Sequence, residues 1–239
     1  MGSAPPTPQP TRDPSTRIAG VLVLSLLGIF GVFATGTRGG GLLSAWDRHV
    51  IELLRGPDLS VPVGPDWLLG VLQQFSALGS GPVVFLLTVV ILGYLLLIHH
   101  HRTALVFLLC ILGAALTTYL LKGAIQRPRP LMMHAAFALD AFSFPSGHSL
   151  IAAAVYPTLG ALLSRVVVGR RVRVYCMLVA GLLTLLIGFS RVYLGRHYPT
   201  DVLAGWCLGL AWSVLAWLLV RRLQHEGVVA AAGEADQTE

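Results

Sequence analysis

The chain contains few charged side chains and almost no lysine. Of its 239 residues, 12% are Asp, Glu, Lys or Arg, and Lys122 is the only lysine. An average soluble domain carries about 25% charged residues, whereas 55% of this chain is hydrophobic. This composition excludes an ordinary soluble domain and indicates a single integral membrane domain.

Cysteine and acidic residues are also scarce. Cys110, Cys176 and Cys207 lie apart inside apolar segments without a Cys-x-x-Cys spacing, which argues against a disulfide framework and a zinc site. Near the polar motifs described below, the acidic residues are Asp201 and, more loosely, Asp140. These are too few for a two-metal clamp, so we expect no metal and no other cofactor.

Six apolar stretches come near the roughly 20 residues that cross a bilayer as a helix. They comprise residues 18–35, 82–98, 103–121, 149–164, 173–190 and 200–220. The sequence therefore predicts an all-α, polytopic membrane protein whose domain, residues 18–222, is a bundle of six transmembrane helices. A disordered N-terminal tail (1–17), rich in Pro, Thr and Ser, and a polar C-terminal tail (223–239) are predicted to flank it.

Two further helices are predicted between the first and second spans, over residues 42–54 and 67–78. In the first, the spacing indicates an amphipathic helix whose apolar side lies opposite Asp47, Arg48 and Glu52. Such helices lie in the membrane interface, with a residue such as Trp46 at headgroup depth. Whether these helices admit lipid to a site or cap the bundle stays open.

Three polar clusters interrupt the apolar pattern. The first runs from Lys122 to Arg129 and Pro130, the second is Pro145-Ser146-Gly147-His148, and the third contains Ser190, Arg191, His197 and Asp201. Together they supply three fixed cations, two imidazoles and one carboxylate. This set suits an oxyanion, most simply a phosphate ester whose leaving oxygen must be protonated.

The ordered pattern K-x6-RP, PSGH and SR-x5-H-x3-D resembles the type 2 phosphatidic acid phosphatase family (PAP2 superfamily), and every fixed position matches. The resemblance runs from about residue 116 to about residue 210. It implies an integral membrane lipid phosphatase in which His197 is the nucleophile and forms a phosphohistidine. It also implies that His148 protonates the leaving alkoxide.

The chemistry of the side chains agrees with this assignment. Lys122, Arg129 and Arg191 are expected to hold the phosphate oxygens in place of metal ions. Ser146 and Gly147 precede an apolar run, so their backbone N–H groups are predicted to form an anion cradle at a helix start.

Asp201 is predicted to orient the nucleophile. In the first turn of a helix that starts near Pro199, its carboxylate is placed to accept the Nδ1 proton of His197. The Nε2 lone pair of His197 would then face phosphorus. A His-x3-Asp pair taken alone, however, is more often a helix cap than a catalytic pair.

Arginines predict the orientation in the membrane. If the N-terminus is cytoplasmic, the inside segments hold Arg12, Arg17, Arg102, Arg165, Arg170, Arg171, Arg173, Arg221 and Arg222. Because basic residues favour the cytoplasmic side, both termini are expected inside and the three clusters outside. The net charge of +6 then reflects topology and phosphate binding, and we expect no nucleic-acid partner.

The leading hypothesis is a multi-pass phosphatase of the bacterial inner membrane with its site facing the periplasm or cell exterior. Within the family, the substrates to consider are phosphatidic acid, phosphatidylglycerol phosphate and undecaprenyl diphosphate. Vanadium-dependent haloperoxidases share the motifs but are large soluble proteins, which six spans argue against. A non-catalytic lipid-binding or transport protein stays open, and turnover in EDTA separates it from a phosphatase.

Overall fold

Every named element in the described part of the chain is an α-helix. The computed structural model describes residues 14–37, 40–55, 61–130 and 142–225. The helices are α1 (Pro14–Gly36), α2 (Leu42–Arg55), α3 (Asp66–Ala77), α4 (Gly81–Leu97), α5 (His101–Ile125), α6 (Gly147–Val166), α7 (Arg170–Tyr193) and α8 (Pro199–His225). Helix α1 begins inside the predicted N-terminal tail, of which residues 1–13 lie outside the described residues, as do residues 226–239 of the C-terminal tail.

Five of these helices are long and apolar enough to cross a bilayer by themselves: α1, α5, α6, α7 and α8. The predicted second span is different, because α4 has 17 residues and meets the criterion only together with α3, from which it is bent by 45°. The described residues therefore contain five candidate membrane spans, or six when the bent α3–α4 pair counts as one. This confirms the predicted all-α membrane bundle.

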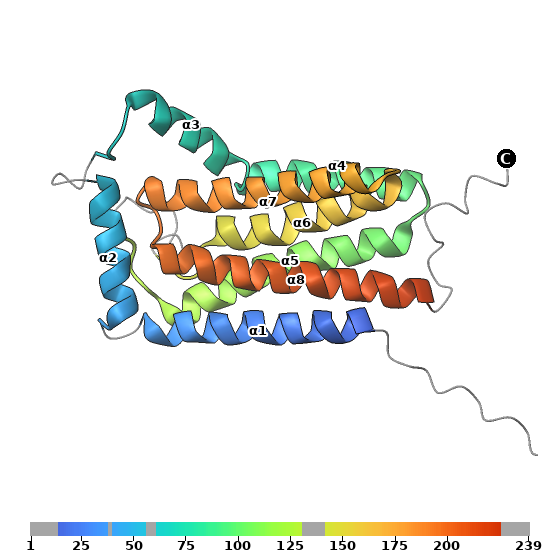
Figure 1. Cartoon of the computed structure of the whole chain (residues 1–239), viewed down its shortest axis with the longest axis horizontal. Coiled ribbons are helices and arrows are strands. Elements are labelled where there is room, and N and C mark those ends of the chain that lie inside the picture. Colours follow the sequence, from blue (N-terminus) through green and yellow to red (C-terminus); the bar gives the residue numbers. More distant parts are fainter. Residues whose placement is uncertain (1–13, 38–39, 56–60, 131–141, 226–239) are drawn as a thin grey trace, which may run out of the picture.

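Helix α6 lies at the centre of the bundle and packs against α5, α7 and α8, while α1 packs against α8 (Figure 1). The α6–α8 contact is close because α8 presents two glycines one turn apart. A Cβ added to Gly205 would lie 2.8 Å from the Ser146 carbonyl oxygen, and one added to Gly209 would lie 2.2 Å from the Leu150 carbonyl oxygen. Small residues at this spacing let two helix backbones touch, and here they hold the first turns of α6 and α8 together.

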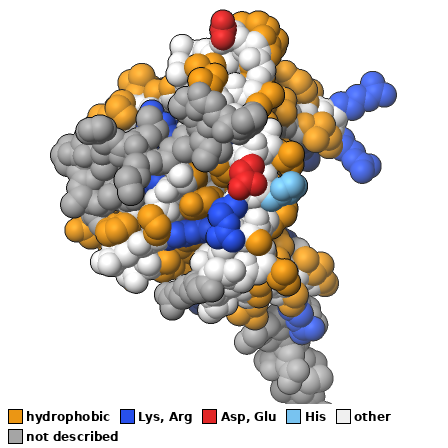
Figure 2. All heavy atoms as spheres, turned by 90° about the vertical axis from the view of Figure 1, so that its left-hand side faces the viewer, with side chains coloured by type: hydrophobic (Ala, Val, Ile, Leu, Met, Phe, Trp, Pro, Cys, Tyr) orange, Lys and Arg blue, Asp and Glu red, His pale blue; other side chains and the backbone are white. Residues whose placement is uncertain are grey.

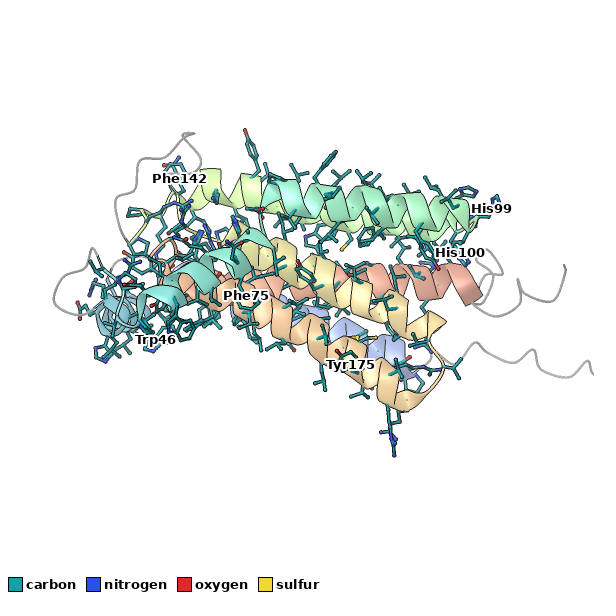
Figure 3. The ribbon with its side chains drawn as sticks, turned by 90° about the horizontal axis from the view of Figure 1, so that it is seen from above. Trp46, Phe75, His99, His100, Phe142 and Tyr175 are labelled. Atoms are coloured by element: carbon teal, nitrogen blue, oxygen red, sulfur yellow. The ribbon has the colours of Figure 1, made fainter. Side chains whose placement is uncertain are left out.

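Helix α2 lies across one end of the bundle (Figure 1), and its orientation differs from the prediction. The residues that it buries are Ser44, Asp47, Ile51 and Arg55, whereas Leu42 is 91% exposed and Leu53 is 64% exposed. Trp46 is partly exposed at this end of the molecule (Figure 3).

Arg48 and Glu52 are exposed on α2, as predicted, but Asp47 is fully buried. The prediction for Asp47 is therefore wrong. The reason is tertiary, because an arginine from another segment neutralises the buried carboxylate, as described below, and the hydrophobic pattern of α2 alone contains no sign of that partner.

Candidate active site

The three polar clusters meet at the end of the bundle that α2 covers. Lys122 lies near the end of α5, His148 lies in the first turn of α6, and Arg191 lies near the end of α7. Asp201 lies in the first turn of α8, and His197 lies in the connection between α7 and α8. Successive helices run in opposite directions, so the C-terminal ends of α5 and α7 lie at the same side of the bundle as the N-terminal ends of α6 and α8 (Figure 1).

His197 is buried and held in one tautomer. His197 is 1% exposed, and its Nδ1 lies 2.8 Å from the carbonyl oxygen of Ser143. A carbonyl oxygen only accepts hydrogen bonds, so Nδ1 carries the proton and Nε2 of the neutral ring keeps its lone pair. Such a ring can act as a nucleophile.

Burial also keeps the His197 imidazole neutral. It lowers the pKa of His197 well below the ordinary value of 6.5, and the charges of Arg191, Arg129 and Lys122 lower it further. The hydrogen bond to Ser143 opposes this shift. The three cations predicted from the sequence therefore all lie close enough to His197 to act on it.

Asp201 makes different contacts from those predicted. Its Oδ2 lies 3.6 Å from Nδ1 of His197, which is too long for a hydrogen bond. Oδ2 instead accepts the backbone N–H of Tyr198 at 2.9 Å, as in a helix-capping box, and Oδ1 accepts Nη1 of Arg127 at 2.6 Å. Asp201 thus caps α8, and Ser143 rather than Asp201 holds the Nδ1 proton of His197.

Arg127 is a site residue that the sequence analysis missed. Besides its bond to Asp201, Nη1 donates to Oγ1 of Thr200 at 2.8 Å, and Nη2 donates to Oδ2 of Asp47 at 2.7 Å. The guanidinium also lies 4.1 Å above the ring of Tyr198. Burial disfavours its charge, but the carboxylates of Asp201 and Asp47 outweigh this and raise the pKa of Arg127. Arg127 therefore remains charged and joins α2 to the start of α8.

The predicted phosphate ligands Arg191 and Arg129 are themselves anchored. Nη1 of the buried Arg191 donates to Oγ of Ser76 on α3 at 2.7 Å. Nη1 of Arg129 donates to the carbonyl oxygen of Arg196 at 3.0 Å. These bonds fix the position of each guanidinium before a ligand binds.

The predicted cradle at Ser146 and Gly147 is only partly available. Ser146 is the N-cap of α6, but its backbone N–H donates to the Asp201 carbonyl oxygen at 3.0 Å. The prediction that this N–H binds phosphate is therefore wrong, because α8 packs against it. Gly147 is the first residue of α6, where backbone N–H groups lack helical partners. A Cβ on Gly147 would meet Cγ2 of Thr118 at 3.0 Å, so the glycine also permits packing against α5.

Figure 2 views this end of the molecule and shows basic side chains among hydrophobic ones. In the described ranges, no three His, Cys, Asp or Glu side chains are placed to hold a metal ion. Asp140 lies outside those ranges. The described groups supply a neutral imidazole, a second histidine and three cations whose charges act on His197, which together suit transfer of a phosphoryl group.

Comparisons with known proteins agree with this chemistry. The family model of the PAP2 superfamily matches residues 103–225. Phosphatidylglycerophosphatase B of Bacillus subtilis (strain 168) is 35% identical over 157 residues, which are 63% of this chain and 74% of that protein. Lipid A 1-phosphatase of Rhizobium johnstonii is 33% identical over 118 residues, which are 46% of this chain and 44% of that protein.

A solved structure is similar over most of the chain. The crystal structure of a transmembrane PAP2 type phosphatidylglycerolphosphate phosphatase from Bacillus subtilis matches with a TM-score of 0.73 and 28% sequence identity. The match covers 84% of this chain and 96% of that one.

Proposed function

The chain belongs to the PAP2 superfamily and is a multi-pass membrane lipid phosphatase, and we propose that His197 is its nucleophile and His148 its general acid. The observation that carries this proposal is the hydrogen bond from Nδ1 of His197 to the Ser143 carbonyl oxygen. It leaves the Nε2 lone pair of a neutral ring available to attack phosphorus.

The proposed reaction has two steps. In the first, Nε2 of His197 bonds to phosphorus, the bond from phosphorus to the lipid oxygen breaks, and His148 gives its proton to that oxygen. In the second, His148 takes a proton from water, and the resulting hydroxide displaces His197 and releases phosphate. Lys122, Arg129 and Arg191 stabilise the charge on the non-bridging oxygens in both steps.

The names of the relatives guide the choice of substrate. One is a phosphatase of phosphatidylglycerophosphate and another acts on lipid A. Both names describe a phosphate group on a membrane lipid, so we propose a lipid phosphate as substrate, with phosphatidylglycerol phosphate as the first candidate. Phosphatidic acid and undecaprenyl diphosphate are the other two.

Phosphate release by the purified protein tests this function. We expect turnover of at least one of the three lipids in the presence of EDTA, because fixed cations take the place of metal ions. Vanadate should inhibit competitively, since it can adopt the five-coordinate geometry of the transferring phosphoryl group. Activity that appears only when a divalent ion is added, or that ignores vanadate, would contradict the proposed site.

We also propose that the protein lies in a bacterial inner membrane with its site outside the cytoplasm. Seven described arginines at the end of the bundle opposite the site support this: Arg17, Arg102, Arg170, Arg171, Arg173, Arg221 and Arg222. At the site end, by contrast, Arg127, Arg129 and Arg191 are held in the contacts of the site described above. Figure 3 shows His99 and His100, next to Arg102, at the end opposite Trp46. Basic residues concentrate on the cytoplasmic side of membrane proteins.

Cysteine labelling of intact cells tests the orientation. In a variant whose three native cysteines are replaced by alanine, Leu42→Cys should react with a membrane-impermeant thiol reagent, because residue 42 is highly exposed at the site end. Val168→Cys, which is 92% exposed between α6 and α7, should react only after the cells are opened. The reverse pattern would place the site in the cytoplasm and leave the phosphatase chemistry intact.

A further inference from the structure

Helix α2 contacts both ends of the loop that carries His197. We call residues 194–198 the nucleophile loop; it connects the end of α7 at Tyr193 to the start of α8 at Pro199. The residues of α2 that face this loop are spaced by four, at Asp47, Ile51 and Arg55, and therefore lie on one side of the helix.

At the α8 end, Asp47 acts as a helix cap supplied by another helix. Its Oδ1 accepts the backbone N–H of Thr200 at 3.0 Å, and its Oδ2 accepts the hydroxyl of Thr200 at 2.5 Å. The first N–H groups of a helix have no partner within the helix, and the positive end of the helix dipole favours a carboxylate. The fully buried Asp47 thus fixes the first turn of α8, which begins two residues after His197.

At the α7 end, Arg55 makes the complementary contact. Its Nη2 donates to the carbonyl oxygen of Tyr193 at 3.1 Å. The last carbonyl groups of a helix also lack helical partners, and the negative end of the dipole favours a cation. Between the two polar contacts, Ile51 packs with Val192 of α7 and Val202 of α8.

A second chain of contacts leads from Asp47 to His197. Asp47 pairs with the side chain of Arg127, and the backbone carbonyl of Arg127 accepts the N–H of Ser143 at 2.7 Å. The carbonyl of Ser143 in turn holds Nδ1 of His197. Asp47 therefore influences both the position of the nucleophile loop and the orientation of the imidazole within it.

We propose that α2 is a brace for the nucleophile loop and that Asp47 and Arg55 are positioning residues for His197. A short loop between two helix ends has little freedom once those ends are fixed, and one rigid helix fixes both. The proposal rests on His197 being the nucleophile. It predicts that damage to the brace weakens the transition state more than the bound substrate, because phosphate is held by cations from α5 and α7 and by Arg129.

Four substitutions on α2 test the brace. Asp47→Asn and Arg55→Met remove a contact to each end of the loop, while Glu52→Gln and Arg48→Met are matched changes at exposed positions of the same helix. We expect kcat to fall by about 10- to 100-fold in the first pair, with KM changed by less than about 2-fold, since small misplacements of reacting groups have effects of this size. The exposed pair should match the wild type.

Inhibitor affinities separate positioning from folding. Vanadate bonds to the nucleophile, so its affinity should fall in parallel with kcat, whereas the affinity for inorganic phosphate should stay unchanged. Both are measured from the shift in unfolding temperature that each ion causes, which does not depend on turnover. Arg55→Lys should recover most of the vanadate affinity, because its ammonium can still donate to Tyr193. Asp47→Glu keeps the charge that Arg127 needs but not the fit to Thr200, so it should fold and still bind vanadate weakly.

Two results would overturn the brace. One is unchanged vanadate affinity in Asp47→Asn, Asp47→Glu and Arg55→Met. The other is an equal loss of vanadate and phosphate affinity, which would mean that α2 only maintains the folded state. If the wild type binds vanadate but hydrolyses none of the lipids, the proposed substrate fails while the affinity comparison still decides the brace.

Discussion

Replacing His197 with asparagine should lower phosphate release by about 10⁴-fold or more, because the variant lacks the lone pair that attacks phosphorus. The amide nitrogen of asparagine takes a position close to that of Nδ1 and can still donate to the Ser143 carbonyl oxygen. We therefore expect the variant to remain folded in detergent. The measurement is the rate of phosphate release at saturating lipid, together with the unfolding temperature.

The covalent intermediate gives a second measurement on the same variant. After rapid mixing with labelled lipid phosphate, the wild type should carry a label that survives alkali and is lost in acid, as a phosphohistidine does, and His197→Asn should carry none. His148→Gln provides the matched control, because it keeps the nucleophile but loses the general acid. With a substrate whose leaving group needs no proton, His148→Gln should recover the first step, measured as a burst of leaving group, although breakdown of the phosphohistidine still lacks its base. His197→Asn should show no burst. Recovery in both variants would contradict the assignment of roles.

The membrane bundle could be predicted from the sequence because a helix that crosses lipid needs a long run of apolar residues. Long apolar runs with few charges predict spans, and five of the six predicted runs lie in helices that meet the criterion alone. The remaining run, residues 82–98, was delimited correctly, since α4 spans Gly81–Leu97, but its continuation into α3 across the bend at residues 78–80 could not be predicted. Here Gly79 packs against Ile187 and His148, and a Cβ on it would lie 2.7 Å from Cγ2 of Ile187. Only the folded structure supplies these neighbours.

The site was predictable to the extent that its residues belong to local motifs. The spacing within each motif identified Lys122, Arg191 and His197, and the alternating direction of the helices brings them to the same end of the bundle. Arg127 stood inside the first cluster, two positions before Arg129, yet its role depends on carboxylates that lie 80 and 74 residues away.

The roles of Asp47 and Ser143 were even harder to predict from the sequence. Asp47 is one of several polar residues on an amphipathic helix, and neither hydrophobic periodicity nor motif spacing distinguishes it from the exposed Glu52. Ser143 contributes a backbone carbonyl, which every residue possesses, so no residue type could have indicated it. The predicted bond from Asp201 to His197 was wrong for the related reason that a carboxylate at the third position of a helix can cap that helix instead.

The second large expected effect is the loss of stability when Arg127 is replaced. Arg127→Met leaves the fully buried carboxylates of Asp47 and Asp201 without their shared cation. Removing one partner from a buried ion pair typically costs about 3–5 kcal/mol, because the remaining charge stays buried without compensation. We expect a loss of this order in the free energy of unfolding in detergent, together with loss of activity, since the two carboxylates that hold the start of α8 would lose their shared counter-ion.

Arg129→Met is the matched control for this prediction. It is the same substitution two positions along the same segment, but the contact of Arg129 is to a backbone carbonyl at the edge of the site rather than to buried carboxylates. Arg129→Met should therefore lower turnover while changing the unfolding free energy far less than Arg127→Met. Adding Asp47→Asn to Arg127→Met should restore part of the lost stability, because one of the two uncompensated charges is removed. If the double variant is as unstable as the sum of the two single variants, Arg127 stabilises the protein through packing alone and the buried charge network does not couple α2 to α8.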